Sequence, residues 1–592
     1  MDEIRNRAQI PDNYKWDMTA LYVSDEAWES ECRALGAKLT DFSAFAGKLG
    51  DKAELLNALK EMFALNCRME RLFVYANCRR DEDNANPVYQ RLSDMAMHLY
   101  QELGQTTAFV DPELLALEDG YIESVMEQPE FADYRVYLGQ VLRQRPHTLS
   151  HEMEALLAAT SEIRNAPDSI YSMMTDADMT FPTIKDAEGN DVEITHGNLI
   201  PLLESADRRV RKDAWEGLLL TLNKWGNTIA TTYSSSVKSD IFTARARHFD
   251  NTLEASLYPN EIPRSVCDNL ISAVHSRFGA MERYIRLRGR VLGLDSVRPY
   301  DMYTPIVDDV EMGLPYEEAY ASVVKSLEVM GKEYTDQLRA AFDQRWIDVY
   351  ENRGKTSGAY STGAYGVHPY VLLNYNKTLD NKMTIAHEMG HAMHTWYSAG
   401  TQPYPTSDYS LFVAEVASTC NEMLVMRDML ATETDKRRRT YLLNHLLEQF
   451  RTTVFRQTLF AEFEMKAHAQ AEAGEPLNKE NLCAIYEDLI RQYYPGMEVG
   501  DTVRYEWMRI PHFYRAYYVY QYATGFSAAV ALSSQILKKG PEDYIKFLKL
   551  GCSVPPIEAL KVAGIDMSTP APVEQALDFF EQVLAEFESL MV

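Results

Sequence analysis

The sequence predicts a mainly α-helical protein in which two helical lobes flank a deep cleft, with one small β-sheet. Apolar residues recur at intervals of three and four over residues 24–165, and again from about residue 204 to the end of the chain. That period is typical of helices with one buried face. Only residues 177–196 and 358–376 show the patterns of strands.

The first helical stretch is divided by prolines. Leu55 and Leu59 belong to a repeated apolar spacing of three and four. Proline removes a helical hydrogen bond and clashes with the preceding turn, so it ends or kinks a helix. The pattern is interrupted at Pro87, Pro112 and Pro129. We therefore expect several antiparallel helices here.

Residues 177–196 have the pattern of a β-hairpin. Apolar residues lie on both sides of the turn-like segment Ala-Glu-Gly-Asn-Asp, which favours two short paired strands. The change in the spacing of apolar residues, from a helical to a strand pattern, indicates a domain boundary. We expect an N-terminal helical domain of residues 1–200 that ends in the hairpin, and a second domain of residues 201–592.

The second strand-like segment, residues 358–376, precedes a helix that carries an informative motif. Here Val371–Tyr375 is expected to be an edge strand, whose unpaired backbone groups are open to an extended chain. The alternative is a short structural sheet in which the glycines serve only as turns. These glycines are Gly358, Gly363 and Gly366.

The motif is His387-Glu388-Met389-Gly390-His391. Residues four apart on a helix lie one turn apart on the same face, so both imidazoles can reach one metal ion. Glu388 points about 100° away from His387 around the helix, where it can reach a water molecule without being a ligand, as a general base does. The pattern is typical of the catalytic core of zincins, the HExxH zinc hydrolases. Gly390 lowers helix stability by about 1 kcal/mol relative to alanine, which indicates that another backbone comes close to it.

The next helical pattern offers a third ligand. From Asp408 the chain continues through residues 410–422, which place Glu415, Ser418 and Glu422 on one stripe of a largely apolar helix. Buried acidic groups need partners. We expect Glu415 to be the third metal ligand, and Ser418 and Glu422 to orient it or the histidine N–H groups. The alternative is that these acids form a solvated face.

Composition excludes several classes of protein. A net charge of −28 argues against binding to nucleic acid or to an anionic membrane, both of which use basic surfaces. Seven cysteines without a CxxC pair are typical of reduced thiols in a cytoplasmic protein. The N-terminal segment has no apolar signal region, and no uncharged apolar run approaches 18 residues. We expect a cytoplasmic protein without a nucleic-acid, membrane or obligate protein partner.

With these motifs in place, the chain resembles the thimet oligopeptidase family of zinc metallopeptidases, and within it the oligoendopeptidase F subgroup, over nearly its whole length. The resemblance is carried by HEMGH at 387–391, FVAEVASTCNE at 412–422, GAYGVHPYVLLNY at 363–375, IPHFYRAYYVYQYATG at 510–525, IPDNYKWDMTALY at 10–22 and RYIRLRGRVLGL at 283–294. The combination is far more specific than HExxH alone.

The resemblance implies a zinc-dependent endopeptidase that hydrolyses internal bonds of short oligopeptides in intracellular peptide turnover, with one Zn²⁺ per chain and Glu388 as general base. It implies that His512 and Tyr520, and next Tyr514, stabilise the oxyanion. It also implies that the segment before the motif helix binds the peptide substrate through Gly363, Tyr365, Gly366, His368 and Tyr370.

Two alternatives belong to other functional classes. A zinc carboxypeptidase on a similar scaffold would need a cation to capture the terminal carboxylate, and three arginines could supply it: Arg504, Arg509 and Arg515. A non-catalytic peptide-binding protein with a structural zinc would need a fourth Cys or His ligand. The nearest cysteine, Cys420, lies five positions beyond Glu415 and off its face.

Overall fold

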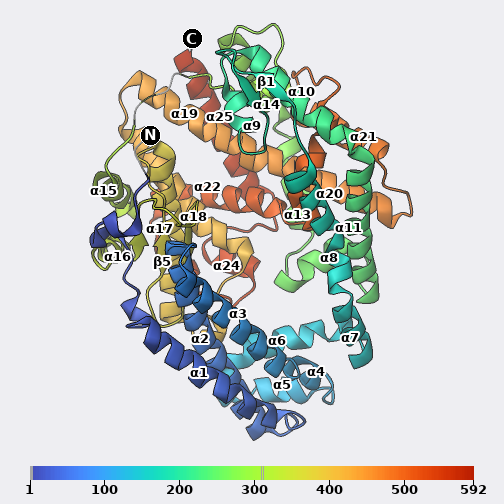
Figure 1. Cartoon of the computed structure of the whole chain (residues 1–592), viewed down its shortest axis with the longest axis vertical. Coiled ribbons are helices and arrows are strands. Elements are labelled where there is room, and N and C mark those ends of the chain that lie inside the picture. Colours follow the sequence, from blue (N-terminus) through green and yellow to red (C-terminus); the bar gives the residue numbers. More distant parts are fainter. Residues whose placement is uncertain (1–3, 308–309, 311, 592) are drawn as a thin grey trace. The chain divides into compact units, whose positions relative to one another are not determined.

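Helices make up most of the computed structural model, which describes residues 4–307, 310 and 312–591 (Figure 1). The prediction of a mainly α-helical protein with small sheets is confirmed. The chain divides into two compact units, each built from three segments: residues 1–146, 311–431 and 532–565 in unit 1, and residues 147–310, 432–531 and 566–592 in unit 2. The expected boundary after residue 200 and the expected cleft stay predictions.

The helices of unit 1 come from all three of its segments. They are α1 (Asp25–Phe42), α2 (Lys52–Glu82), α3 (Pro87–Thr107), α4 (Val110–Leu115), α5 (Tyr121–Met126), α6 (Arg135–Gln144), α15 (Tyr316–Ser326), α16 (Lys332–Asp343), α17 (Leu379–Thr401), α18 (Leu411–Thr432), α23 (Glu542–Leu548) and α24 (Pro556–Val562). Helix α22 (Tyr520–Lys539) contributes residues to both units.

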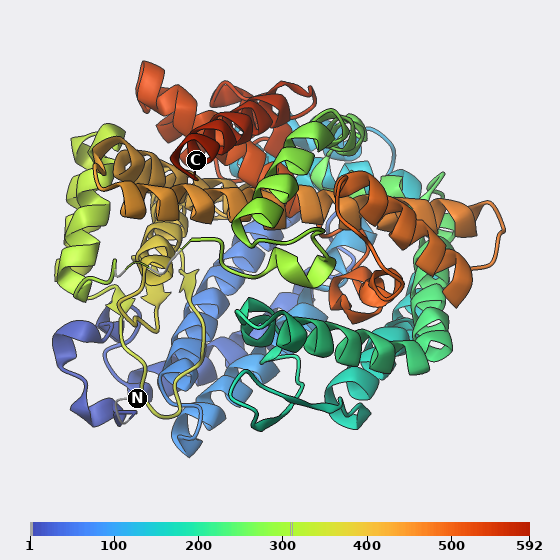
Figure 2. The ribbon, with the colours of Figure 1, turned by 90° about the horizontal axis from the view of Figure 1, so that it is seen from above.

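Unit 2 is also helical. Its helices are α7 (His151–Ala159), α8 (Ser161–Ser172), α9 (Leu199–Glu204), α10 (Arg208–Lys224), α11 (Gly226–Ala246), α12 (Thr252–Leu257), α13 (Ser265–His275), α14 (Phe278–Val291), α19 (Lys436–Gln449), α20 (Arg456–Glu472), α21 (Lys479–Tyr493) and α25 (Ala571–Met591). Helix α19, the π-helix η12 (Phe450–Phe455) and α20 follow one another as one long rod (Figure 2).

The N-terminal bundle of unit 1 is built from α1, α2 and α3, which pack against one another. Asp51 caps α2 by accepting hydrogen bonds from the N–H groups of Ala53 and Glu54. Pro87 is the first residue of α3, where its missing N–H costs nothing. The bundle core contains Trp28, which is fully buried and donates its indole N–H to a backbone carbonyl.

The predicted hairpin is confirmed. Strands β1 (Thr183–Lys185) and β2 (Asp191–Glu193) pair antiparallel, with Ile184 opposite Val192.

The sheet of unit 1 corrects one expectation. Its strands are β3 (Ile347–Asp348), β4 (Tyr360–Thr362) and β5 (Tyr370–Leu372), in the order β3-β5-β4. The expected edge strand is therefore central, because β5 pairs in parallel with β3 and antiparallel with β4. Strand β4 is partly exposed at one edge, whereas β3 is buried. Both β4 and β5 pack against α17.

The state of the cysteines and the character of the longest helices can also be compared with the expectations. All seven cysteines are free thiols, as expected. Among the described residues, no helix combines the length and the apolar character needed to cross a bilayer.

Candidate active site

Helix α17 places two imidazoles side by side. Thr378 caps its N-terminus by accepting the N–H of Asn381, and the helix then continues to Thr401. The rings of His387 and His391 lie one turn apart, with centroids 4.9 Å from each other. The motif is therefore on one helix face, as the spacing predicts.

Helix α18 brings a carboxylate to these rings. Glu415 Oε2 lies 3.4 Å from His387 Nε2 and 3.7 Å from His391 Nε2. One ligand atom of each residue lies within 4.8 Å of the other two. Two imidazoles and one carboxylate thus converge on one point in unit 1.

At Gly390 the backbones of the two helices come into direct contact. A Cβ atom on Gly390 would lie 2.6 Å from Ser418 Cα and 2.7 Å from Ala417 O. The backbone approach expected at Gly390 is confirmed, and it brings Glu415 close to the histidines.

One carboxylate and one hydroxyl contact these candidate ligands. Glu422 Oε1 lies 2.6 Å from His387 Nδ1, which leaves Nε2 facing Glu415. Ser418 is completely buried, and its hydroxyl lies within hydrogen-bond distance of Glu415 Oε2, at 3.2 Å, and of the Glu415 backbone carbonyl, at 3.1 Å. Both residues therefore contact the groups that the sequence assigned to them.

Two polar residues that the sequence did not indicate tie the helices together. Asn421 donates its side-chain N–H to the backbone carbonyl of Ala386 at 3.2 Å, and it accepts the hydroxyl of Tyr334 at 2.9 Å. The available signal was a polar amide next to Glu422 in an otherwise apolar stretch. Its partner Tyr334, on α16, could not be predicted from the spacing of residues in the sequence.

Burial and charge shift the pKa values of the site. Burial alone would lower the pKa of His387, but its bond to Glu422 and the nearby carboxylates outweigh burial and raise the pKa to about 9. Burial lowers the pKa of His391 to about 3, with repulsion from His387 adding to it. Burial raises the pKa of Glu388 to about 7, and the side chain is only 6% exposed.

The donor set fits a tetrahedral divalent metal. Bonds of about 2.0–2.2 Å at tetrahedral angles place neighbouring ligand atoms about 3.4 Å apart, close to the observed 3.4 and 3.7 Å. Imidazole and carboxylate ligands suit zinc, and three protein ligands leave one position open for chemistry.

Comparison with known proteins identifies the family. Residues 201–579 match peptidase family M3, and residues 113–181 match the oligopeptidase F N-terminal family. The chain belongs to peptidase family M3. This M3 peptidase is 45% identical to oligopeptidase PepF of Bacillus subtilis over 100% of the chain and 89% of the relative. It is 40% identical to the group B oligopeptidase PepB of Streptococcus agalactiae, over 99% and 98% of the two chains.

Solved structures show the same fold. Oligoendopeptidase-F from Enterococcus faecium superposes with a TM-score of 0.74 at 36% identity, over 96% of this chain and 99% of that one. A crystal structure from Chlamydophila abortus superposes with a TM-score of 0.94 at 34% identity, over 99% and 100%.

The segment before α17 contributes residues with different exposure. In the M3 peptidase, Gly366 is exposed and has a φ of 79°, and Gly363 is half-buried. The Tyr365 hydroxyl donates to the carbonyl of Gln402 at 3.0 Å. His368 stacks on Trp346, and burial lowers its pKa.

Tyr370 differs in burial from the other residues of the expected substrate-binding set, whose role stays a prediction. It is 0% exposed and belongs to the core formed with the N-terminal helices. Its side chain is therefore a core residue in this structure, whereas the other four residues of the segment retain some exposure.

The expected oxyanion donors lie in unit 2. His512 is exposed and stacks near Tyr518. The hydroxyl of Tyr514 lies 2.6 Å from that of Thr232, and Tyr520 is 6% exposed.

The three arginines considered for carboxylate capture also lie in unit 2, and each already has a partner. Arg504 lies 3.5 Å from Glu487, and Arg509 lies 3.5 Å from Glu506. The guanidinium of Arg515 lies 4.2 Å from the centre of the Tyr518 ring.

Proposed function

We propose that this chain is a zinc-dependent endopeptidase that hydrolyses internal bonds of short oligopeptides, with one zinc ion held by His387, His391 and Glu415. The observation that carries the proposal is the convergence of these three ligand atoms beside the buried carboxyl group of Glu388. Relatives that match nearly the whole chain are named as oligopeptidases, which supports this substrate class.

When bound, zinc supplies Lewis acidity that polarises the scissile carbonyl and acidifies water. The Glu388 carboxylate accepts a proton from the attacking water and delivers it to the leaving amine. Its raised pKa, about 7, suits both directions of transfer near neutral pH. Glu422 keeps His387 in the tautomer whose Nε2 can bind metal.

Oxyanion stabilisation is assigned to His512 and Tyr520, with Tyr514 next. A hydroxyl or imidazole aimed at the developing charge can contribute roughly 10²–10³ in rate. Tyr514 is the weakest of the three, because its hydroxyl already contacts Thr232.

Peptide binding is assigned to the exposed edge of the unit 1 sheet. Strand β4 is the partly exposed edge and packs against α17. An extended peptide can pair with such an edge through its backbone, which makes binding tolerant of sequence. Gly363, Tyr365, Gly366 and His368 follow β4 directly and complete the proposed surface.

A cytoplasmic location and a role in intracellular peptide turnover belong to the same proposal. Seven free cysteines support it, because reduced thiols persist in the cytoplasm. Short peptides are the proposed binding partners, and no obligate protein partner is needed for the chemistry.

The test uses a quenched fluorescent peptide of about ten residues, blocked at both termini, with product identification by mass spectrometry. We expect internal cleavage that stops when zinc is chelated and returns when zinc is restored. Failure to cleave the blocked peptide, with release of single residues from an unblocked one, would replace this proposal with a carboxypeptidase.

A further inference from the structure

Four arginines share two glutamates in the interior of unit 2. The ion pairs are Arg288–Glu448 at 3.2 Å, Arg451–Glu448 at 2.6 Å, Arg456–Glu506 at 2.6 Å and Arg509–Glu506 at 3.5 Å. Among the described residues these arginines have no other ion-pair partner, so the cluster has two more cations than anions. The side chains of Arg288 and Arg451 are 1% and 4% exposed. Because each glutamate serves two arginines, part of the positive charge is left uncompensated, which is costly where the side chains are buried.

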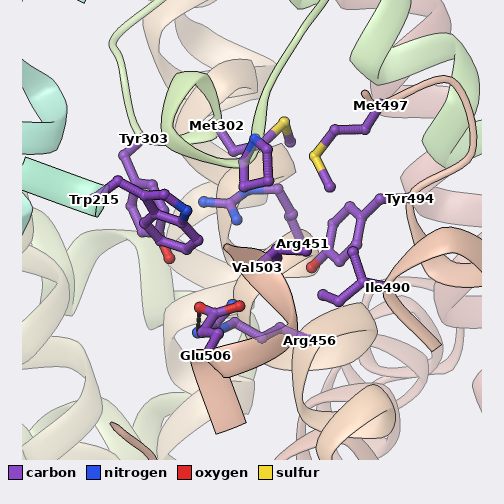
Figure 3. Close-up of a pocket in the computed structure, with 11 residues that line it drawn as sticks. Trp215, Met302, Tyr303, Arg451, Arg456, Ile490, Tyr494, Met497, Val503 and Glu506 are labelled. Atoms are coloured by element: carbon purple, nitrogen blue, oxygen red, sulfur yellow. Dashed lines mark hydrogen bonds and ion pairs between the residues drawn. The ribbon is translucent and has the colours of Figure 1, made fainter. Parts of the chain in front are cut away.

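A small cavity lies against two of these arginines (Figure 3). It has a volume of about 20 Å³. A water molecule needs about 10–15 Å³, so the cavity has room for one small ion or water but not for an organic ligand. Its lining consists of Trp215, Pro299, Met302, Tyr303, Arg451, Arg456, Ile490, Tyr494, Met497, Val503 and Glu506.

Two hydrogen-bond donors in this lining lack a partner. Trp215 is 2% exposed and Tyr494 is 4% exposed. Within the described part of the chain, neither the indole N–H of Trp215 nor the hydroxyl of Tyr494 has a hydrogen-bond partner. An indole N–H can only donate. In the view of Figure 3, Arg451 lies between these two side chains. Donors and cations therefore surround one small space.

Glu506, the acidic residue of the lining, does not offset both cations that line the cavity. Glu506 is 1% exposed, and its carboxylate already accepts from Arg456 at 2.6 Å and from the Tyr486 hydroxyl at 2.9 Å. The Glu506 charge therefore offsets that of Arg456, which also lines the cavity, whereas Arg451 shares Glu448 with Arg288. The guanidinium of Arg451 lies 5.4 Å from the centre of the Tyr303 ring, which adds no negative charge to the cavity.

The backbone that carries Arg451 is unusual. Arg451 is the second residue of the π-helix η12, and Arg456 is the first residue of α20. Short π segments inside helices are rare and occur often at functional sites. Here the segment joins α19 to α20 and puts both cationic side chains on the cavity.

We propose that this cavity binds one small inorganic anion of the size of chloride, held by the Trp215 indole N–H, the Tyr494 hydroxyl and the guanidinium groups of Arg451 and Arg456. The anion supplies a counter-charge to the arginine cluster and an acceptor to both donors. The anion has a structural role. The cavity exists only in the folded protein, and a ligand that binds only the folded state raises the free energy of unfolding.

The first test is thermal unfolding of the full chain in sodium chloride against sodium gluconate at constant ionic strength. Gluconate is too large for the cavity. We expect the melting temperature to rise with each tenfold increase in chloride above the dissociation constant. In Tyr494→Phe and Trp215→Phe, each of which removes one donor, this rise should be reduced.

Tyr316→Phe in unit 1 is the matched control. Tyr316 is also a buried tyrosine whose hydroxyl has no hydrogen-bond partner among the described residues, but no arginine of the cluster belongs to its unit. Tyr316→Phe should keep the full chloride response. Equal loss of the response in this variant and in Tyr494→Phe would overturn the proposal.

Anomalous diffraction gives a direct test on the unaltered protein. Crystals grown in sodium bromide should show an anomalous peak between Arg451, Trp215 and Tyr494. Absence of a peak together with the same melting temperature in chloride and gluconate would mean that the cavity holds water only.

Discussion

A Cβ atom on Gly390 would lie 2.6 Å from the Cα atom of Ser418, so α17 and α18 touch backbone to backbone beside the candidate metal ligands. Glycine is thus required inside the metal-binding motif for a packing reason. Since Glu415 lies one turn before Ser418 on α18, the helix separation sets how closely its carboxylate approaches the two histidines.

Gly390→Ala should force the helices apart. The clash is with backbone atoms of Ala417 and Ser418, which cannot rotate away, and overpacking costs about 1–3 kcal/mol. Misplacing Glu415 by about 1 Å should lower kcat/KM roughly 10²-fold. Peptidase assays and metal analysis measure both effects.

Gly400→Ala is the control for this substitution. Gly400 lies on the same helix and has no atom within 4 Å of a Cβ position. Alanine there should leave activity unchanged and raise helix stability by up to about 1 kcal/mol. Similar losses in both variants would show that helix composition matters rather than the contact with Ser418.

Much of this site could be predicted from local sequence, and the reason is geometric. Helix periodicity places His387 and His391 on one face of α17 and Glu415 on a stripe of α18, and the metal-ligand chemistry of these residues predicts that they meet. Gly390 signalled a close backbone because glycine is otherwise unfavourable in a helix. The central position of β5 could not be predicted, because its neighbour β3 is a two-residue parallel strand formed by Ile347–Asp348. Such a strand has no alternation to detect.

The polar links between helices also escaped prediction. Asn421 bonds to Ala386 and to Tyr334, which lies 87 residues earlier in the chain. Side-chain partners at that separation depend on tertiary packing, which no local period encodes. The cavity beside Arg451 depends in the same way on residues from several helices of unit 2.

Glu422→Gln should weaken metal binding while leaving the fold intact. The amide oxygen can still accept from His387 Nδ1, so this hydrogen bond is kept while the negative charge is lost. Loss of such a group typically lowers metal affinity by about 10–100-fold, and the lower end is expected here. Competition with a zinc chelator measures it. Ser418→Ala removes a neutral donor to Glu415 and should have a smaller effect; the reverse order of effects would contradict the assignment.

Glu388→Gln should abolish turnover and retain the metal. A positioned general base contributes roughly 10²–10⁴ in rate, and Glu388 is not one of the three converging ligands. The variant should therefore have a strongly reduced kcat but the same zinc content as the unaltered enzyme. Activity near that of the unaltered enzyme would exclude Glu388 as the base.

The rate should fall in acid through titration of the same residue. Burial raises the pKa of Glu388 to about 7, and a bound cation would lower it from there. Only the ionised carboxylate can accept a proton, so kcat/KM should decrease as pH falls through an apparent pKa at or below about 7. A pH profile that stays flat from about pH 8 to 5 would contradict this role.

Asp348 should make the stability of unit 1 decrease as the pH falls. Burial alone would raise its pKa, but the charges of Lys355, 2.7 Å away, and of Arg7, 2.9 Å from Oδ1, outweigh burial and hold the pKa below its usual value. A carboxyl group with a lowered pKa in the folded state stabilises above its unfolded pKa, near 3.9. That contribution is lost as pH falls through the folded pKa.

Asp348→Asn should remove this acid-dependent step and destabilise the protein at neutral pH. The side chain of Lys355 is 0% exposed, so losing its partner leaves an unpaired buried charge that costs about 3–5 kcal/mol. Chemical unfolding between about pH 3 and 7 measures both changes. Asp12→Asn is the control. Lys15 also lowers the pKa of Asp12, but this pair is at the surface and an exposed ion pair contributes little, so both changes should be much smaller than in Asp348→Asn. If Asp348→Asn keeps the acid dependence of the unaltered chain, the step belongs to another carboxyl group.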